Sequence, residues 1–285
     1  MERKDFLKLT GAAGVVALFP GAGHAEDDHD HPMPEEAPGG GSCVLIPTET
    51  AGPYPLDLSG TSSYYRQDIT DGYEGTPLRV RLTIVNVNAD CAPLANLRVD
   101  VWHCNKDGYY SGFVNQGYLG SQNNTSLRFF RGIQLTDADG VEAFETIYPG
   151  WYSGRVTHIH FQVFLSSAVS VVSQMCFPED VTAEVQSGAL YSGHGVDPLT
   201  NATDPGIFAT PSGAYVNQRL EVSADGAGGY LGTLTVGVSA PSTGVSAYRE
   251  PLTGGQFVLG QNQPNPMVRT TTIPLTLQST SDVVL

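Results

Sequence analysis

The sequence has little positive charge. Of its 285 residues, 14 are lysine or arginine and 29 are aspartate or glutamate, so the formal net charge at pH 7 is −15. A chain this acidic repels the phosphate backbone of nucleic acids and the anionic surface of membranes. We therefore expect neither nucleic acid nor a lipid surface among its partners.

Long apolar runs are also missing. The apolar stretch over residues 11–23 is too short to span a bilayer and no later stretch is long enough, so no membrane span is expected. A basic start precedes this stretch and small residues follow at 23–25, which predicts an export signal peptide over residues 1–25. The segment "RKDFLK" resembles a twin-arginine signal with Lys4 in place of the second arginine, so the export route stays open. We expect a periplasmic, cell-surface or extracellular protein.

Cysteine is scarce. The chain has four, and their even number in an exported protein favours disulfides. Three pairings are open, and the sequence does not choose among them. The alternative is that the four cysteines are small buried apolar residues. They are Cys43, Cys91, Cys104 and Cys176.

Helical patterns are nearly absent as well. The one short helical segment that we predict covers residues 178–188, where Pro178 suits a first turn. Elsewhere apolar and β-branched residues alternate in short runs, and glycine, proline and aspartate separate them. This pattern predicts an all-β fold, which we take to be a β-sandwich with long loops and few short helices. The predicted strands cover residues 78–87, 97–103, 131–136, 142–147, 156–165, 171–177 and 229–240.

The composition changes at both ends of this β-rich region. Residues 26–42 are acidic and rich in proline and glycine, which predicts a disordered linker. Residues 43–240 form the main domain. Residues 241–285 begin like a linker, and "LGQNQPNPM" and "TTTIPLTL" within them resemble the start of bacterial C-terminal secretion-sorting domains, here truncated. The alternative for this tail is one extra edge strand.

Two histidines alternate on a predicted strand. His158 and His160 are two residues apart, so their side chains project to the same face and can reach one metal ion. The spacing alone is equally consistent with structural histidines. No carboxylate lies nearby, because residues 147–172 contain no aspartate or glutamate.

Tyrosines surround the histidine pair instead. Tyr148 and Tyr152 precede it, and "GYYSGF" carries Tyr109 and Tyr110 about forty residues earlier. A phenolate is a hard anionic donor that suits a ferric ion, whose charge makes the phenol ionise below its usual pKa of about 10. Two phenolates and two imidazoles would hold iron in the ferric state.

Four segments together resemble one family. They are "TETAGPYP", "LRVDVWHCNKDGYYSGF", "IYPGWYSGRVTHIHFQV" and "VVSQMCF". In these segments the chain resembles the intradiol ring-cleavage dioxygenases, which are catechol and protocatechuate enzymes with a mononuclear non-haem Fe(III) site. The resemblance covers residues 43–240 and makes this the expected catalytic domain. It implies cleavage of a catechol-type ring by O2 to a cis,cis-muconate-type diacid.

The resemblance also implies a residue for each position of the site. The metal ligands would be Tyr110, Tyr152, His158 and His160, with Tyr152 the displaceable one. The active-site arginine and glutamine would be Arg155 and Gln174. The pocket-lining residues would be Thr50, Pro53 and Tyr54.

One spacing departs from the best-known members of this family. Tyr152 precedes His158 by only six residues, where those members have a longer loop. Six residues still span about 20 Å when extended, so both can reach one metal ion. A shorter loop removes pocket wall, so the catechol that the site accepts stays open.

Other readings remain open beside the enzyme. The chain could be an exported β-sandwich that binds a ligand or displays a surface without turnover. A cupin-like metalloenzyme ranks low, because no carboxylate follows the histidines before Glu179. The oligomeric state is open, with a homodimer as one alternative. We expect only packing or structural roles for Trp102, His103, Tyr109, Tyr118, Tyr148 and Trp151, and no evident partner for His194.

Overall fold

A computed structural model describes residues 43–166, 170–209, 214–241, 257–259 and 275–277. The predicted signal peptide and acidic linker lie outside the described residues. So does most of the 241–285 tail, whose described strands β12 (Phe257–Leu259) and β13 (Leu275–Leu277) pair with each other.

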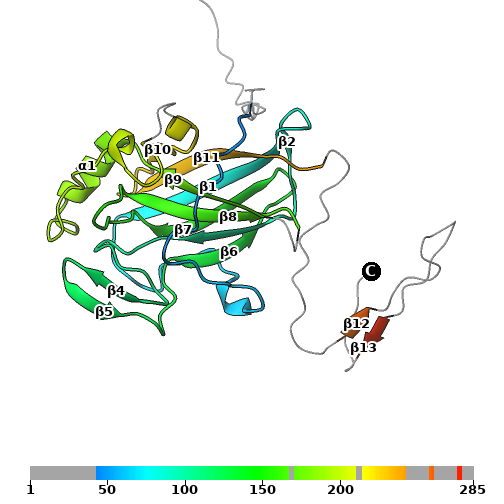
Figure 1. Ribbon diagram of the computed structural model, residues 1–285, viewed down its shortest axis with the longest axis horizontal. Helices are drawn as coiled ribbons and strands as arrows, with labels where there is room; N and C mark the ends of the chain where they lie inside the picture. Colours follow the sequence, from blue (N-terminus) through cyan, green and yellow to red (C-terminus); the bar gives the residue numbers. More distant parts are fainter. Residues whose placement is uncertain (1–42, 167–169, 210–213, 242–256, 260–274, 278–285) are drawn as a thin grey trace, which may run out of the picture. The chain divides into compact units, whose positions relative to one another are not determined.

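Strands dominate the body of the chain (Figure 1). The single α-helix among the described residues is α1 (Glu179–Ser187), and short 3-10 helices cover Ser62–Tyr64, Asn201–Thr203 and Ala214–Asn217. The strands are β1 (Pro77–Asn86), β2 (Ala92–Pro93), β3 (Arg98–Trp102), β4 (Val114–Gly117), β5 (Gly120–Asn123), β6 (Arg131–Leu135), β7 (Val141–Ile147), β8 (His158–Phe164), β9 (Ser170–Cys176), β10 (Glu221–Ala224) and β11 (Tyr230–Val238).

These strands form two main sheets. In the first, β1 pairs in parallel with β11, which continues to β10, while β7 and the short β2 pair with β1 in antiparallel fashion. The second sheet is fully antiparallel in the order β6-β3-β8-β9. Within the described residues the strands β4 and β5 pair with each other alone, as a separate hairpin.

Alternation along the strands explains why the two sheets pack together. In β1, buried Leu78, Val80 and Leu82 alternate with exposed residues and contribute to the core. In β8, Ile159 and Phe161 contribute to the same core. Apolar side chains from both sheets therefore meet in one layer, which defines a sandwich. The predicted all-β sandwich is confirmed, and its seven predicted strands are all present.

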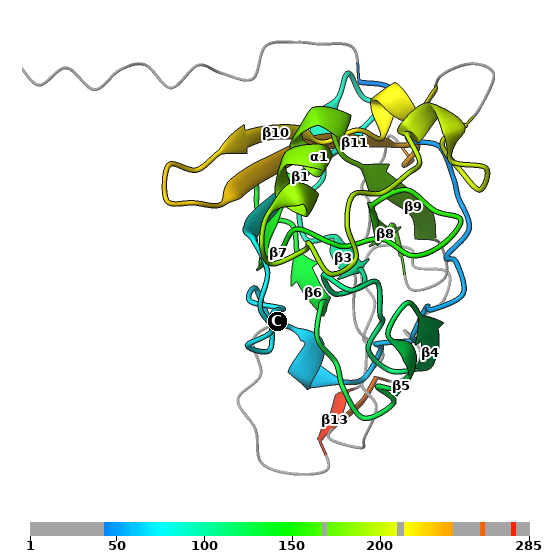
Figure 2. The same cartoon turned by 90° about the vertical axis from the view of Figure 1, so that its left-hand side faces the viewer.

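The helix α1 covers one end of this core. Pro178 is its N-cap residue, and Glu179 and Asp180 occupy the first turn, as the sequence predicted. Val185 belongs to the hydrophobic core, and Thr182 bonds to the hydroxyl of Tyr148. Figures 1 and 2 both place α1 beside β10 and β11. None of the described helices is long and apolar enough to cross a membrane.

The four cysteines divide into two kinds. Cys43 and Cys91 form a disulfide, whereas Cys104 and Cys176 are free and buried. The expectation of disulfides is therefore confirmed for one pair and wrong for the other two residues. Burial raises the pKa of both free thiols to about 12, so they remain neutral and pack as small apolar groups.

Candidate functional site

One row of side chains crosses the second sheet on the face that points away from the core. The register places four residues opposite one another on β6, β3, β8 and β9: Arg131, Trp102, His160 and Gln174. Residues opposite one another in antiparallel strands project to the same face. His158, two residues before His160, joins them there. The sandwich therefore uses one face of β8 for its core and the other for the site.

The two histidines approach each other through their Nε2 atoms, which lie 3.2 Å apart. The Nδ1 atom of His158 is 2.5 Å from the carbonyl oxygen of Val156. Because a carbonyl can only accept, Nδ1 carries the hydrogen and Nε2 of the neutral ring keeps its lone pair. Burial lowers the pKa of His158 to about 3 and that of His160 well below its usual value. Both rings are therefore neutral, which is the form that binds metals.

Tyr110 reaches the histidines from the turn that follows β3. Its side chain is 0% exposed, and its backbone exchanges two hydrogen bonds of 2.9 and 2.7 Å with the amide of Asn115. The ring of Tyr54 stacks on it at 4.5 Å, and the Arg131 guanidinium lies 5.9 Å from its centre. Burial raises the pKa of the phenol well above its usual value. Its buried hydroxyl finds no hydrogen-bond partner among the described residues, which is costly unless something else binds it.

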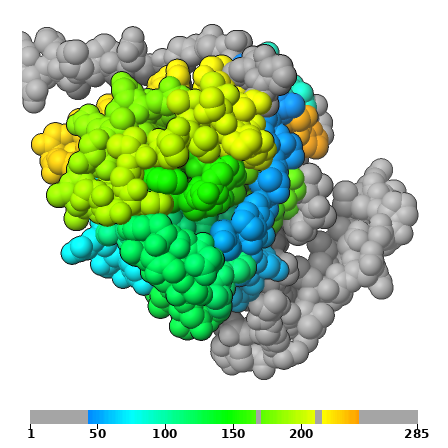
Figure 3. All heavy atoms as spheres, turned by 60° about the vertical axis from the view of Figure 1, so that its left-hand side comes forward, coloured from blue at the N-terminus to red at the C-terminus, as the bar shows by residue number. Residues whose placement is uncertain are grey.

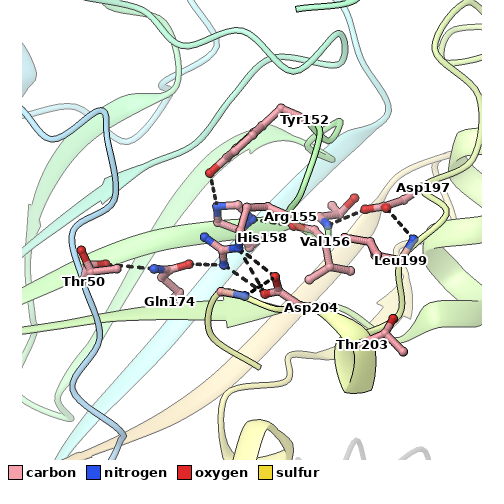
Figure 4. A network of polar contacts seen from close by, with 12 residues as sticks. Thr50, Tyr152, Arg155, Val156, His158, Gln174, Asp197, Leu199, Thr203 and Asp204 are labelled. Carbon is pink, nitrogen blue, oxygen red and sulfur yellow. Dashed lines mark hydrogen bonds and ion pairs between the residues drawn. The ribbon is translucent and has the colours of Figure 1, made fainter. Parts of the chain in front are cut away.

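Tyr152 approaches from a tight turn between β7 and β8. The backbone N–H of Arg155 donates to the carbonyl oxygen of Tyr152 at 3.2 Å, and Gly154 has a φ of +89°. The phenol oxygen of Tyr152 lies 3.4 Å from Nε2 of His158 (Figure 4). Burial raises the pKa of Tyr152 to about 12. The chain therefore reverses direction between Tyr152 and His158. This turn, rather than an extended segment, brings the two side chains together.

The segment over residues 47–54 lies against the cluster. A side-chain carbon added at Gly52 would sit 2.8 Å from Cε1 of His160, so this backbone passes directly over the histidine. Thr50 and Tyr54 flank this contact, and Pro53 between them is exposed. Figure 3 shows the blue surface of this segment beside the green surface of residues near 150 and the teal surface of residues near 115. Two of the three predicted pocket residues, Thr50 and Tyr54, contact residues of the site.

Arg155 and Gln174 are joined in one polar network (Figure 4). The guanidinium of Arg155 donates to Oε1 of Gln174 at 2.6 Å and forms an ion pair with Asp204 at 3.0 Å. The amide of Gln174 donates in turn to the carbonyl oxygen of Thr50 at 2.9 Å. The arginine is therefore held on both sides, at the edge of the tyrosine–histidine cluster.

The donor set suits a hard, highly charged cation. In the described part of the chain, no group of three or more His, Cys, Asp or Glu side chains could hold a metal ion, so a metal here would depend on the tyrosines. The unprotonated Nε2 of His158 and the buried hydroxyl of Tyr110, which has no partner among the described residues, are the observations that fit such an ion. The phenols stay protonated unless a cation lowers their raised pKa values. Tyr110, Tyr152, His158 and His160 thus fit a ferric ion, the metal that the sequence predicted.

The remaining aromatic residues mostly have structural contacts. His103 bonds to the carbonyl oxygen of Cys104 and to Thr146, both at 2.7 Å, as expected of a structural histidine. The expectation that His194 has no partner is wrong. Its ring lies between those of Tyr118 and Trp151, at 4.1 and 3.9 Å. Stacking between loops that are distant in the sequence leaves no local sequence signal.

Two charged residues at the site were not predicted from the sequence. Arg131 lies in an ordinary-looking strand, and only the register of β6 against β3 reveals that it reaches the Tyr110 turn. Asp204 follows Arg155 by 49 residues and has no recognisable motif around it. The one signal that the sequence offered was a charged residue in a predicted strand. It could have indicated Arg131, but not Asp204.

The fold and the cluster together define a class of protein. It is a β-sandwich with two tyrosines and two histidines gathered at the outer face of one sheet. Comparison with known proteins identifies the family within that class. A family model described as "Dioxygenase" matches residues 52–192, which include the four candidate ligands, Arg155 and Gln174.

Individual relatives agree with this match. The chain is 30% identical over 141 residues to catechol 1,2-dioxygenase 1 of Acinetobacter lwoffii, and the match covers 42% of this chain and 43% of that protein. The structure of an intradiol ring-cleavage dioxygenase from Tetranychus urticae superposes with a TM-score of 0.59 at 26% identity, covering 72% of this chain and 99% of that one. The chain belongs to the intradiol ring-cleavage dioxygenase family, as the sequence motifs predicted.

Proposed function

We propose that this protein cleaves a catechol-type ring between its two hydroxyl-bearing carbons, using ferric iron and O2, to give a cis,cis-muconate-type diacid. The observation that carries the proposal is the convergence of four side chains from three segments. Tyr152 lies 3.4 Å from His158, His158 lies 3.2 Å from His160, and the buried hydroxyl of Tyr110 has no hydrogen-bond partner among the described residues.

Each candidate ligand has a distinct task in this proposal. Tyr110, His158 and His160 stay in place, since all three are at least 98% buried. Tyr152 is partly exposed and releases its position to the catechol, whose proton its phenolate oxygen accepts. A ferric ion held by these groups supplies one thing, which is activation of the bound catechol toward O2.

Arg155 and Gln174 supply fixed polar groups at the edge of the cluster, where Asp204 offsets the net charge of the arginine. Because Asp204 and Thr50 hold this pair, no reorganisation is needed when negative charge builds up on the ring. The proposal therefore assigns them to stabilisation of the reacting ring rather than to metal binding.

Export is part of the same proposal. Residues 1–25 resemble a signal peptide, and the disulfide between Cys43 and Cys91 agrees with an oxidising compartment. The substrate would then be a catechol outside the cytoplasm, in the periplasm, at the cell surface or beyond it.

The test is oxygen uptake by iron-loaded protein supplied with catechol under ¹⁸O2. The proposal predicts one O2 consumed per catechol and a ring-opened diacid that contains both labelled oxygen atoms. An aldehyde product, or catechol binding without oxygen uptake, would contradict it. The second of these results would favour the alternative of a ligand-binding sandwich without turnover.

A further inference from the structure

The positive charges near the cluster already have partners. Two arginines contact residues of the cluster: Arg131 lies over the ring of Tyr110, and Arg155 donates to Gln174, the neighbour of His160 across the sheet. Arg131 is 1% exposed and donates to the carbonyl oxygens of Tyr54 and Ser111. It lies against the ring of Tyr110, so its charge faces the phenolate of the proposed site.

Arg155 is paired even more tightly. Its Nε lies 3.0 and 3.2 Å from the two carboxylate oxygens of Asp204, and one Nη lies 3.2 Å from the second of them. The Asp204 side chain is 0% exposed and that of Arg155 is 13% exposed, so solvent screens this pair little. The carboxylate therefore offsets the charge of the guanidinium at the edge of the site. Asp204 lies beyond the residues 52–192 that match the family model, so the match assigns no function to it.

We propose that the pairing of Asp204 with Arg155 restricts the site to catechols without a negatively charged ring substituent. The proposal rests on the proposed function and deepens it. A ring carboxylate that enters the site loses water and must meet an uncompensated cation, or its burial is strongly unfavourable. Arg131 faces the ring of Tyr110 and Arg155 is paired with Asp204, so neither offers an uncompensated charge to such a carboxylate.

The first experiment compares matched substrates on the iron-loaded, wild-type chain. Oxygen uptake is measured with catechol, 4-methylcatechol and 3,4-dihydroxybenzoate at pH 8, where ordinary carboxyl groups are ionised. We expect kcat/KM for the two uncharged catechols to exceed that for the carboxylate by at least about tenfold.

The second experiment removes the negative charge of Asp204. Asp204→Asn should raise the ratio of kcat/KM for 3,4-dihydroxybenzoate to that for 4-methylcatechol about tenfold, since Arg155 then has a free charge to offer. The substrate comparison on the wild-type chain keeps the proposal testable if Asp204→Asn fails to fold.

The matched control removes one carboxylate elsewhere. Asp225 accepts backbone N–H groups of Ala227 and Gly229 in the turn between β10 and β11, and Asp225→Asn should leave the substrate ratio at its wild-type value. A wild-type preference for the carboxylate, or an unchanged ratio in folded Asp204→Asn, would overturn the charge proposal while the ring-cleavage activity stands. If no catechol is consumed although iron is bound, the proposed function itself fails and this inference falls with it.

Discussion

The two tyrosines of the cluster stand on turns of very different construction. Tyr110 is 0% exposed, and its turn is held by Asn115, by a stacked Tyr54 and by Arg131 beneath the ring. Tyr152 is partly exposed on a short turn, and its phenol oxygen makes a long contact of 3.4 Å with Nε2 of His158. The structure therefore has a fixed phenol and a phenol with room to move in one site.

This difference matches two separate chemical tasks. A ligand that keeps a metal ion in place gains from packing that admits no alternative position. A ligand that must leave when the catechol arrives gains from an exposed turn with few contacts. We therefore assign the permanent position to Tyr110 and the displaceable position to Tyr152, as the family resemblance also implies.

The largest expected effect comes from exchanging each phenol for a phenyl ring. Tyr110→Phe should lose most of the bound iron, because the site then lacks its fixed anionic ligand. Tyr152→Phe should keep the iron but lower kcat with catechol by about 10²-fold, since it removes the group that accepts the substrate proton. Metal analysis and oxygen uptake on both variants measure the two effects.

These two variants also show how the comparison could break. Equal iron loss in Tyr110→Phe and Tyr152→Phe would mean that the contrast between the two turns has no functional counterpart. Iron retention in Tyr110→Phe together with loss in Tyr152→Phe would reverse the assignment.

A smaller effect is expected from the brace under Tyr110. Arg131→Met leaves the carbonyl oxygens of Tyr54 and Ser111 without their donor in a buried region, which should lower the free energy of unfolding by about 3–5 kcal/mol. Urea denaturation of the metal-free protein measures this loss. Arg79→Met is the control, because that arginine is exposed on β1 and makes only a surface ion pair with Glu145. A loss below about 1 kcal/mol for Arg131→Met would show that the brace is weak.

The smallest expected effect comes from replacing one glycine in each of the two turns. Gly108 and Gly154 both have positive φ values, of +83° and +89°. Gly154→Ala adds a methyl group with nothing within 4 Å, so it should cost only the conformational strain of about 1 kcal/mol. Gly108→Ala would in addition collide with the carbonyl oxygen of Trp151 and should cost about 2 kcal/mol more. Thermal or urea unfolding of both variants measures these losses. Equal losses of unfolding free energy would contradict the tighter packing of the Tyr110 turn.

The sequence predicted those parts of the site that short motifs encode. Three such motifs lie within a few residues of a strand end. They are the alternation of His158 and His160, the "GYYSGF" turn, and the spacing of Arg155 from His158. The sandwich itself follows from period-two patterns that the structure confirms in β1 and β7.

The parts that escaped depend on register and on loops. The position of Arg131 is set by the pairing of β6 with β3, and a shift of one residue would turn its side chain to the other face. Asp204 reaches Arg155 from a connection 49 residues away, and His194 stacks between two loops. Such contacts are tertiary, so no local propensity or spacing reports them.

The central claim is that the phenol oxygens of Tyr110 and Tyr152 bind ferric iron together with His158 and His160. The most direct measurement is the visible absorption spectrum of the purified protein after loading with ferric iron and removal of the excess. The account predicts a burgundy protein, with a tyrosinate-to-iron charge-transfer band that weakens in Tyr152→Phe. A colourless protein that retains zinc in preference to iron would contradict it.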